Sequence, residues 1–461
     1  MTKRALVGLV VVAILGVGLF LLYQTKPAKD GGSVPVPQEN SPVPLEKGAK
    51  PPVQAGDSEG VPDKLLDRMA RKKVEPPKRP EIPQGVVSSE IPEDNGMHWF
   101  ILAAERMPEL PWELRDTCEA ILDHGYRHDP RIVEKIEECS EAFEAVRKGL
   151  EVGNIMMPLR DPEKPMGYSA RWRDVTRMMT VKAMMQANKG NFDDALDTLD
   201  TVVRFAAESS RGGMLMNYLI GFAMENIGTR KLANTLRTPG VSAEQCRNAA
   251  ARLDALEKNA PRIVDAMSVE ADMAQHWFDK HSGSLDKVHE QITSAVKDSG
   301  EEGKRFAETA TPEQCLETYR EHVENLRKQV PLYGVPVHEF DESAFQEISA
   351  GNLLSEKSLG IGLNILKNEA LRSSGRRGAA IVAALEAYQR DNGNYPATLD
   401  ALAPAVLPEL PPDPFTGKPF GYTRQNAGYL LYSAGPNMKD DGGKGKPWNP
   451  KADDYVIVRA D

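Results

Sequence analysis

The sequence predicts a mainly helical protein with a small α+β head at its C-terminus and a single transmembrane helix at its N-terminus. Apolar residues recur at steps of three and four through most of residues 96–371, as they do along one face of an α-helix. Short runs typical of β-strands begin only near residue 419, and an uncharged apolar stretch opens the chain. We therefore divide the chain into an anchor (1–23), a tether (24–95), a helical domain (96–371) and a head (372–461).

The anchor is the stretch 5–23, nineteen residues without a charge. As a helix it would span roughly 28 Å, close to the ~30 Å of a bilayer's hydrocarbon core. Lys3 and Arg4 precede it, which favours a cytoplasmic N-terminus and a body outside the cytoplasm, although Lys26 and Lys29 weaken this preference. A cleaved signal peptide is the other interpretation, but the stretch is long for one and lacks a strong cleavage site. Both interpretations predict an envelope protein, and the first a single-pass inner-membrane protein with a periplasmic body.

The tether is rich in Pro, Gly, Lys and Glu and has little apolar surface to offset the entropy of ordering. We expect it to be disordered or extended and to act as a spacer. The whole chain has a net charge of −10 and no long basic run, which argues against a nucleic-acid partner. Its hydrophobic fraction of 41% is that of a globular protein with one anchor.

The clearest helices of the middle region follow one another around residue 190. Apolar positions repeat with a helical period over 171–188 and again from Phe192 onward, and Lys189-Gly190-Asn191 separates the two runs. Gly190 suits the end of one helix, and Asp193 and Asp194 suit the first turn of the next. This pair of helices resembles one tetratricopeptide (TPR) unit, which implies a surface for protein contacts. An ordinary helical bundle explains the same pattern.

No sequence motif for catalysis stands out. The chain has no HExxH, P-loop, GxSxG or dinucleotide fingerprint. His124 and His128 have a metal-ligand spacing, but Gly125 between them and Asp129-Pro130 after them indicate a helix end. The four cysteines form no CxxC pair; Cys118 and Cys139 are the nearest candidates for a disulfide, and the other interpretation is four small buried side chains.

The head begins with a helix near Ser374 that we expect to end at Asp391-Asn392-Gly393. A helical turn over 397–402 follows. Two strands are predicted at 419–423 and 429–433, joined by a Gly-containing turn, and a last strand at 455–458.

Three motifs in this order resemble the globular domain of the major pseudopilin of type II secretion systems: Tyr388-Gln-Arg-Asp-Asn-Gly-Asn-Tyr-Pro396, Asp413-Pro-Phe-Thr-Gly-Lys-Pro-Phe-Gly-Tyr422 and Leu431-Tyr-Ser-Ala-Gly-Pro-Asn437. The resemblance covers about 85 residues and implies a pseudopilin-like α+β fold. The chain departs from the family because it lacks the family's processing site and because more than 350 residues separate anchor and head. Packing into a filament through the N-terminal helix is therefore not expected.

The resemblance also implies a calcium ion in the loop between the last two strands, with Asn437 at a position where the family usually has Asp and with Asp453 and Asp454 as the later acidic pair. The residues support this independently, because the Gly-rich loop 434–452 cannot form a core and oxygen-bearing side chains gather in and beside it. The predicted calcium ligands are Asn437, Asp440, Asp441, Asp453 and Asp454.

These patterns predict a non-enzymatic, membrane-anchored scaffold of the cell envelope that binds protein partners, in connection with a type II secretion or pilus-like system. No small-molecule substrate is indicated. The alternative is a hydrolase of envelope polymers with a carboxylate site in the helical domain. A passive spacer is the third hypothesis.

Overall fold

The computed structural model describes residues 88–158, 167–425 and 428–459, with the side chains of 358–361 excepted. The predicted anchor and most of the predicted tether lie outside these residues. Within the described ranges, no helix is long and apolar enough to cross a membrane. The end of the tether is ordered: residues 88–90 form a 3₁₀ helix, and Ile91 is buried.

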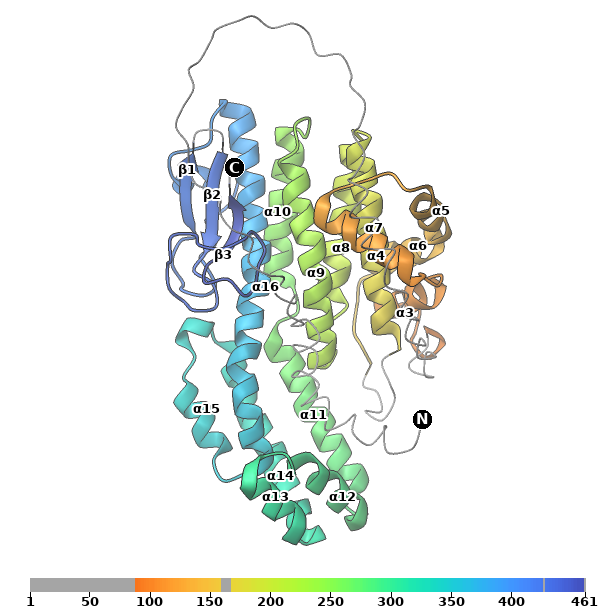
Figure 1. Ribbon diagram of the computed structural model, residues 1–461, viewed down its shortest axis with the longest axis vertical. Helices are drawn as coiled ribbons and strands as arrows, with labels where there is room; N and C mark the ends of the chain where they lie inside the picture. The colour runs from red at the N-terminus through yellow and green to blue at the C-terminus, as the bar shows by residue number, and fades with distance from the viewer. Residues whose placement is uncertain (1–87, 159–166, 426–427, 460–461) are drawn as a thin grey trace, which may run out of the picture. The chain divides into compact units, whose positions relative to one another are not determined.

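The described residues are mainly helical and end in a small sheet (Figure 1). The α-helices are α3 (Gly96–Arg106), α4 (Trp112–His124), α5 (Pro130–Glu138), α6 (Ser140–Val152), α7 (Tyr168–Asn188), α8 (Phe192–Glu208), α9 (Leu215–Leu236), α10 (Ala243–Asn259), α11 (Ile263–His281), α12 (Leu285–Val296), α13 (Gly300–Thr309), α14 (Pro312–Gln329), α15 (Glu342–Ser349) and α16 (Leu353–Asn392). The 3₁₀ helices are η1 (Ser88–Glu90), η2 (Val330–Gly334), η3 (Val337–Glu339) and η4 (Leu399–Leu402), and the strands are β1 (Gly421–Gln425), β2 (Gly428–Ser433) and β3 (Tyr455–Arg459).

Helix ends follow local sequence. The Asp129 side chain accepts a hydrogen bond at the start of α5, with Pro130 in the first turn, and α4 stops at His124 before Gly125. The predicted helix end between the two histidines is therefore confirmed. Helix α10 begins with a capping box in which Ser242 and Gln245 bond to each other's backbone N–H groups.

The predicted helical hairpin is present as α7 and α8. Gly190 between them has a φ of +81°, a conformation that glycine adopts without strain. Asp193 and Asp194 lie in the first turn of α8, as predicted. Helix α9 then packs against both α7 and α8 (Figure 1).

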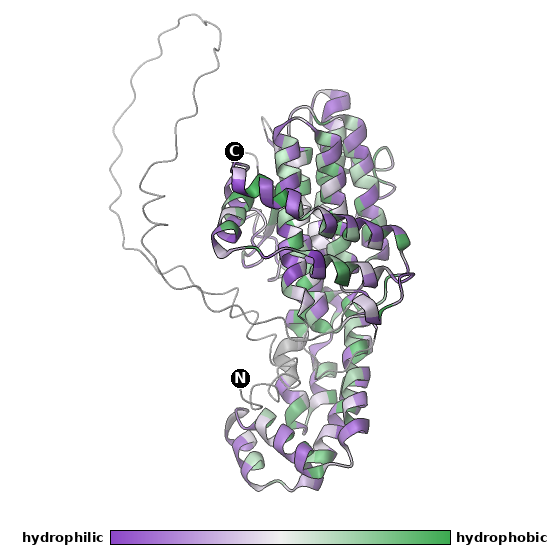
Figure 2. Ribbon diagram, turned by 90° about the vertical axis from the view of Figure 1, so that its right-hand side faces the viewer, coloured by the Kyte–Doolittle hydropathy of each residue, from purple (hydrophilic) through white to green (hydrophobic). Residues whose placement is uncertain are grey.

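A continuous apolar core joins α3 to α9. Trp172 is fully buried in this core, and its indole nitrogen donates to the Phe100 carbonyl over 2.7 Å. Hydrophilic and hydrophobic residues are mixed along each helix, as expected where one stripe is buried and the other solvated (Figure 2). All four cysteines are free and buried, which confirms the interpretation as small buried side chains.

A second core lies among α11, α12 and α14 and includes Trp277, Val288 and Tyr319. His322 of α14 is buried at 1% exposure; its Nδ1 lies 3.0 Å from the Ser355 hydroxyl, and its Nε2 has no partner. Because burial disfavours the charged imidazolium, the pKa of His322 is lowered to about 4.

Helix α16 differs from the sequence prediction. The sequence suggested that a helix of the head begins near Ser374, whereas α16 is a single helix of 40 residues that crosses the proposed 371/372 boundary. It ends where predicted, with Gly393 in the left-handed conformation. The helical region and the head therefore share one continuous element.

The three strands form an antiparallel sheet in the order β1-β2-β3, close to the predicted positions. Strands β2 and β3 pack against α16. A side chain at Gly378 of α16 would lie 2.7 Å from Ile457, so glycine is required for this close approach of helix and strand. The observed architecture is thus mainly helical with a small C-terminal sheet.

A buried network of charges joins α9, α10 and α16. On α9, Glu225 accepts from Arg372 over 2.7 Å and from Arg376 over 3.0 Å. On α10, Glu257 accepts from Arg376 over 2.5 Å and from Arg377 over 2.8 Å. The side chains of Glu225, Arg372 and Arg376 are at most 3% exposed, so each charge depends on its partners for the hydrogen bonds that water would supply.

The substitution Glu225→Gln should lower the free energy of unfolding by about 3 kcal/mol, because it leaves two buried guanidinium groups short of a carboxylate. Urea denaturation of the full chain measures this change. As a control, Glu301→Gln removes one partner of an exposed pair with Lys304 and should have almost no effect. Equal effects of the two substitutions would contradict a structural role for the network.

The low pKa of His322 predicts a specific loss of stability in acid. The unfolded chain takes up a proton near pH 6.5 while the folded chain resists until about pH 4, so stability falls as pH falls through this window. Between pH 7.5 and pH 5 the wild type should lose about 2 kcal/mol more than His322→Gln. Urea midpoints at the two pH values test this, and parallel losses in both proteins would refute it.

Candidate functional site

The loop between β2 and β3 is organised around the buried carboxylate of Asp454. Asp454 is 0% exposed. Its two oxygens accept hydrogen bonds from the backbone N–H groups of Asp441 (3.1 Å), Gly443 (2.7 Å) and Lys444 (2.9 Å). A carboxylate with several backbone donors is well stabilised as an anion, so Asp454 itself fastens the loop.

The other predicted calcium ligands lie in or beside the same loop but serve different partners. Asp440 accepts from the Tyr432 hydroxyl over 2.8 Å, Asp441 accepts from the Asn437 amide over 2.8 Å, and Asp453 is exposed. In the part of the chain that the structure describes, no group of three or more His, Cys, Asp or Glu side chains is placed to hold a metal ion. Calcium also takes amide and backbone carbonyl oxygens, so calcium binding in this loop stays a prediction.

A second buried carboxylate links two of the motifs singled out in the sequence. Asp413 is 2% exposed and accepts from the Ser433 hydroxyl over 2.7 Å and from the Ala434 N–H over 2.9 Å. It also accepts from the Phe415 N–H, which shapes its own turn. The motif after residue 412 is thereby tied to the end of β2.

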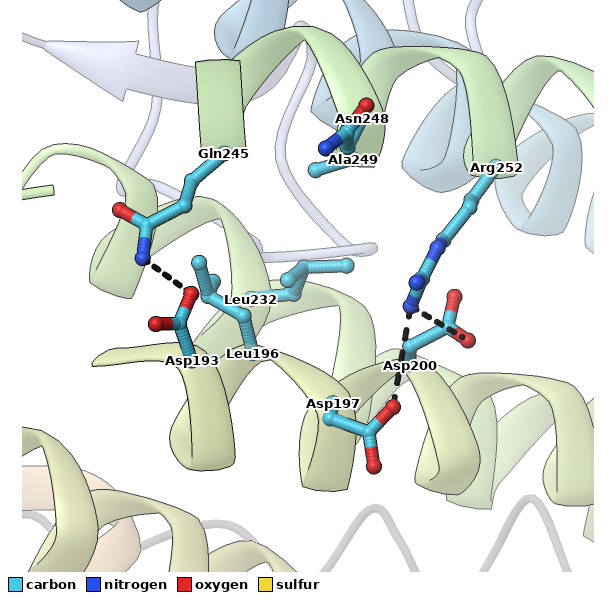
Figure 3. A pocket seen from close by; sticks show the side chains of 9 residues that line it. All are labelled: Asp193, Leu196, Asp197, Asp200, Leu232, Gln245, Asn248, Ala249 and Arg252. Atoms are coloured by element: carbon cyan, nitrogen blue, oxygen red, sulfur yellow. Dashed lines mark hydrogen bonds and ion pairs between the residues drawn. The ribbon is translucent and has the colours of Figure 1, made fainter. Parts of the chain in front are cut away.

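A cavity of about 260 Å³ lies between α8 and α10, with Leu232 of α9 also in its wall (Figure 3). The α8 side is acidic. Asp193, Asp197 and Asp200 occupy positions spaced by four and three residues, which places them on one face of the helix. The α10 side presents Gln245, Asn248, Ala249 and Arg252.

Hydrogen bonds and ion pairs connect the two sides of this cavity. Gln245, held by the capping box, donates to Asp193 over 2.6 Å. Arg252 lies 3.3 Å from Asp200 and 3.9 Å from Asp197 (Figure 3). Burial raises the pKa of the Asp200 carboxyl, although Arg252 opposes this shift. Asp197 and Asp200 therefore face Arg252, Asp200 also lies 4.0 Å from Arg204, and Asp193 faces Gln245. The cavity has three carboxyl groups against these two guanidinium groups. We call it the acidic pocket.

No local pattern of the sequence singles out the acidic pocket as a whole. The acidic stripe of α8 can be read from the spacing of Asp193, Asp197 and Asp200. Arg252 comes from a helix about fifty residues later, and nothing local pairs the two. The sequence also does not single out Glu369, Arg372 and Arg376 of α16, because their partners Glu225 and Glu257 lie on other helices.

Comparisons with known proteins do not assign the chain to a family. The chain matches no protein-family model, no curated protein and no solved structure.

Two adjacent substitutions separate the roles of the loop carboxylates. Asp454→Asn replaces one of the two acceptor oxygens by an NH2 group, which cannot accept from the backbone N–H groups that face it. This substitution should destabilise the head by about 2 kcal/mol. Asp453→Asn removes an exposed carboxylate and should leave the melting temperature unchanged in calcium-free buffer. Calorimetry of the full chain measures both.

The same two proteins test calcium. If calcium binds the loop, millimolar calcium should raise the melting temperature of the wild type, and Asp453→Asn should reduce that rise. An unchanged wild-type melting temperature would contradict calcium binding.

Proposed function

We propose that this chain is a non-enzymatic, membrane-anchored scaffold of the cell envelope, and that its acidic pocket binds a basic segment of a protein partner. The acidic pocket carries the proposal. Its three carboxyl groups outnumber the guanidinium groups of Arg252 and of Arg204, which lies beside Asp200. Leu196 and Leu232 also line it, so it suits the charged end and the apolar stem of a Lys or Arg side chain. The pocket lies on α8, the second helix of the hairpin that resembles a TPR unit.

The place and the system in which the scaffold works rest on the sequence. The uncharged stretch 5–23 and the charges before it support a single-pass inner-membrane protein with a periplasmic body. The resemblance of the head to a major pseudopilin supports partners from a type II secretion or pilus-like system. The continuity of α16 favours a role in which the head and the helical region hold partners at a set spacing.

One observation favours the alternative of a hydrolase. Asp197 and Asp200 lie in one pocket, and the raised pKa of Asp200 is the property of a general acid. However, both carboxyl groups face the same Arg252, an arrangement suited to a structural ion pair. Binding therefore remains the better supported function.

Charge reversal tests the scaffold proposal. In membranes of its own host, crosslinking should join the wild-type chain to a defined set of envelope proteins. Asp197→Lys should abolish at least one of these adducts, because it places a cation where the partner's cation would bind. Glu301→Lys reverses an exposed charge on α13 and should preserve all of them.

Two outcomes would contradict the proposal. One is an identical set of adducts in the wild type and in Asp197→Lys. The other is release of soluble fragments from purified envelope polymers by the wild type but not by Asp200→Asn, which would establish the hydrolase instead.

A further inference from the structure

A separate cavity of about 420 Å³ lies where α10, the start of α11 and α16 meet two loops. One loop contains Val335–His338 in its wall, and the other contains the turn after Pro412. Leu366, Ala370 and Val337 provide apolar surface. We call this space the junction cavity, because it adjoins both the helical region and the head.

Two arginines of the charge network line the junction cavity with unused donors. Arg376 donates through Nε to Glu257 and through Nη1 to Glu225. Arg377 donates through Nε to Glu257 and through Nη1 to the Pro412 carbonyl. Among the residues that the structure describes, these four bonds leave the Nη2 atoms of both guanidinium groups for another acceptor. Arg376 is 3% exposed, so its position is fixed before any ligand arrives.

The charged side chains that line the cavity are equal in number, so the donors and acceptors that remain unpaired decide which ligand it favours. Arg262, Arg376 and Arg377 line it together with the carboxyl groups of Glu257, Glu369 and Asp413. Arg376 and Arg377 hold the pKa of Glu257 below its ordinary value although burial opposes them, so these charges are present at neutral pH.

Glu369 adds less negative charge than its position suggests. The Tyr218 hydroxyl and the Ile263 N–H donate to its carboxyl group. Burial raises the pKa of this carboxyl, although the arginines oppose the shift. Asp413 is likewise turned away, because its oxygens accept from Ser433 and Ala434 in the head. The free donors therefore belong to arginines.

We propose that the junction cavity binds a small ligand that carries an oxyanion, a carboxylate or a phosphate, through the Nη2 atoms of Arg376 and Arg377. Guanidinium groups suit both oxyanions, because their planar donors match the oxygen spacing. The volume lies within the range of small-molecule sites, and the wall formed by Leu366, Ala370 and Val337 suits an apolar portion of the ligand. Such a ligand would contact the helical region and the loop of the head together.

Binding of inorganic phosphate and of malonate to the full chain in detergent tests the proposal, with isothermal titration calorimetry at constant ionic strength. At least one probe should bind saturably, and the preferred probe distinguishes phosphate from carboxylate recognition. Arg377→Gln should weaken that binding at least tenfold. The matched control Arg247→Gln removes an exposed arginine of α10 that pairs with Asp391 and should change nothing.

A second variant is needed because Arg377→Gln could weaken binding by unfolding the protein. Pro336 is exposed at the wall of the junction cavity, outside the charge network. Pro336→Asp adds a carboxylate that competes for the arginines, and it should also weaken binding at least tenfold while the melting temperature in the absence of probe stays within about two degrees of wild type. Absence of saturable binding by either probe, or wild-type affinity in folded Arg377→Gln or Pro336→Asp, would overturn the proposal. Asp197→Lys should leave this binding unchanged, so the result is independent of the scaffold proposal.

Discussion

The fold depends on one buried constraint, the sharing of Glu225 and Glu257 among three arginines of α16. Each charged group in this network loses its hydrogen bonds to water on folding, and neighbouring side chains must replace them. Helices α9, α10 and α16 therefore have one arrangement in which every group has its partners. An apolar interface of the same size tolerates a small shift of one helix along another, whereas here such a shift would break the ion pairs. The network therefore sets the register of the helices that carry the head.

The geometry of both cavities depends on this register, because α10 lines both of them. Helix α10 contributes Arg252 and Gln245 to the acidic pocket on one side and Glu257 to the junction cavity on another. A displacement of α10 would change the pairing of Arg252 with the carboxyl groups of α8 and the position of Arg377 at once. The two sites are thus parts of one packed assembly, although they have opposite charge preferences.

Much of the local structure could be predicted from sequence, because it depends on neighbours along the chain. The break at Gly190, the stop at Gly393 and the strands near the C-terminus follow from turn chemistry and from residue spacing. The course of α16 could not be predicted in the same way, because the charges near Arg372 resemble a domain border until Glu225 and Glu257 are known to face them. The three backbone N–H groups that donate to Asp454 could not be predicted either, because they depend on the path of the whole loop.

The length of α16 has a mechanical consequence. At 1.5 Å per residue its 40 residues extend about 60 Å. One part packs against α14 and α15, and another against β2 and β3. A helix clamped in this way behaves as a stiff rod, so a pull or twist applied at the distal helices reaches the sheet without being absorbed by a hinge.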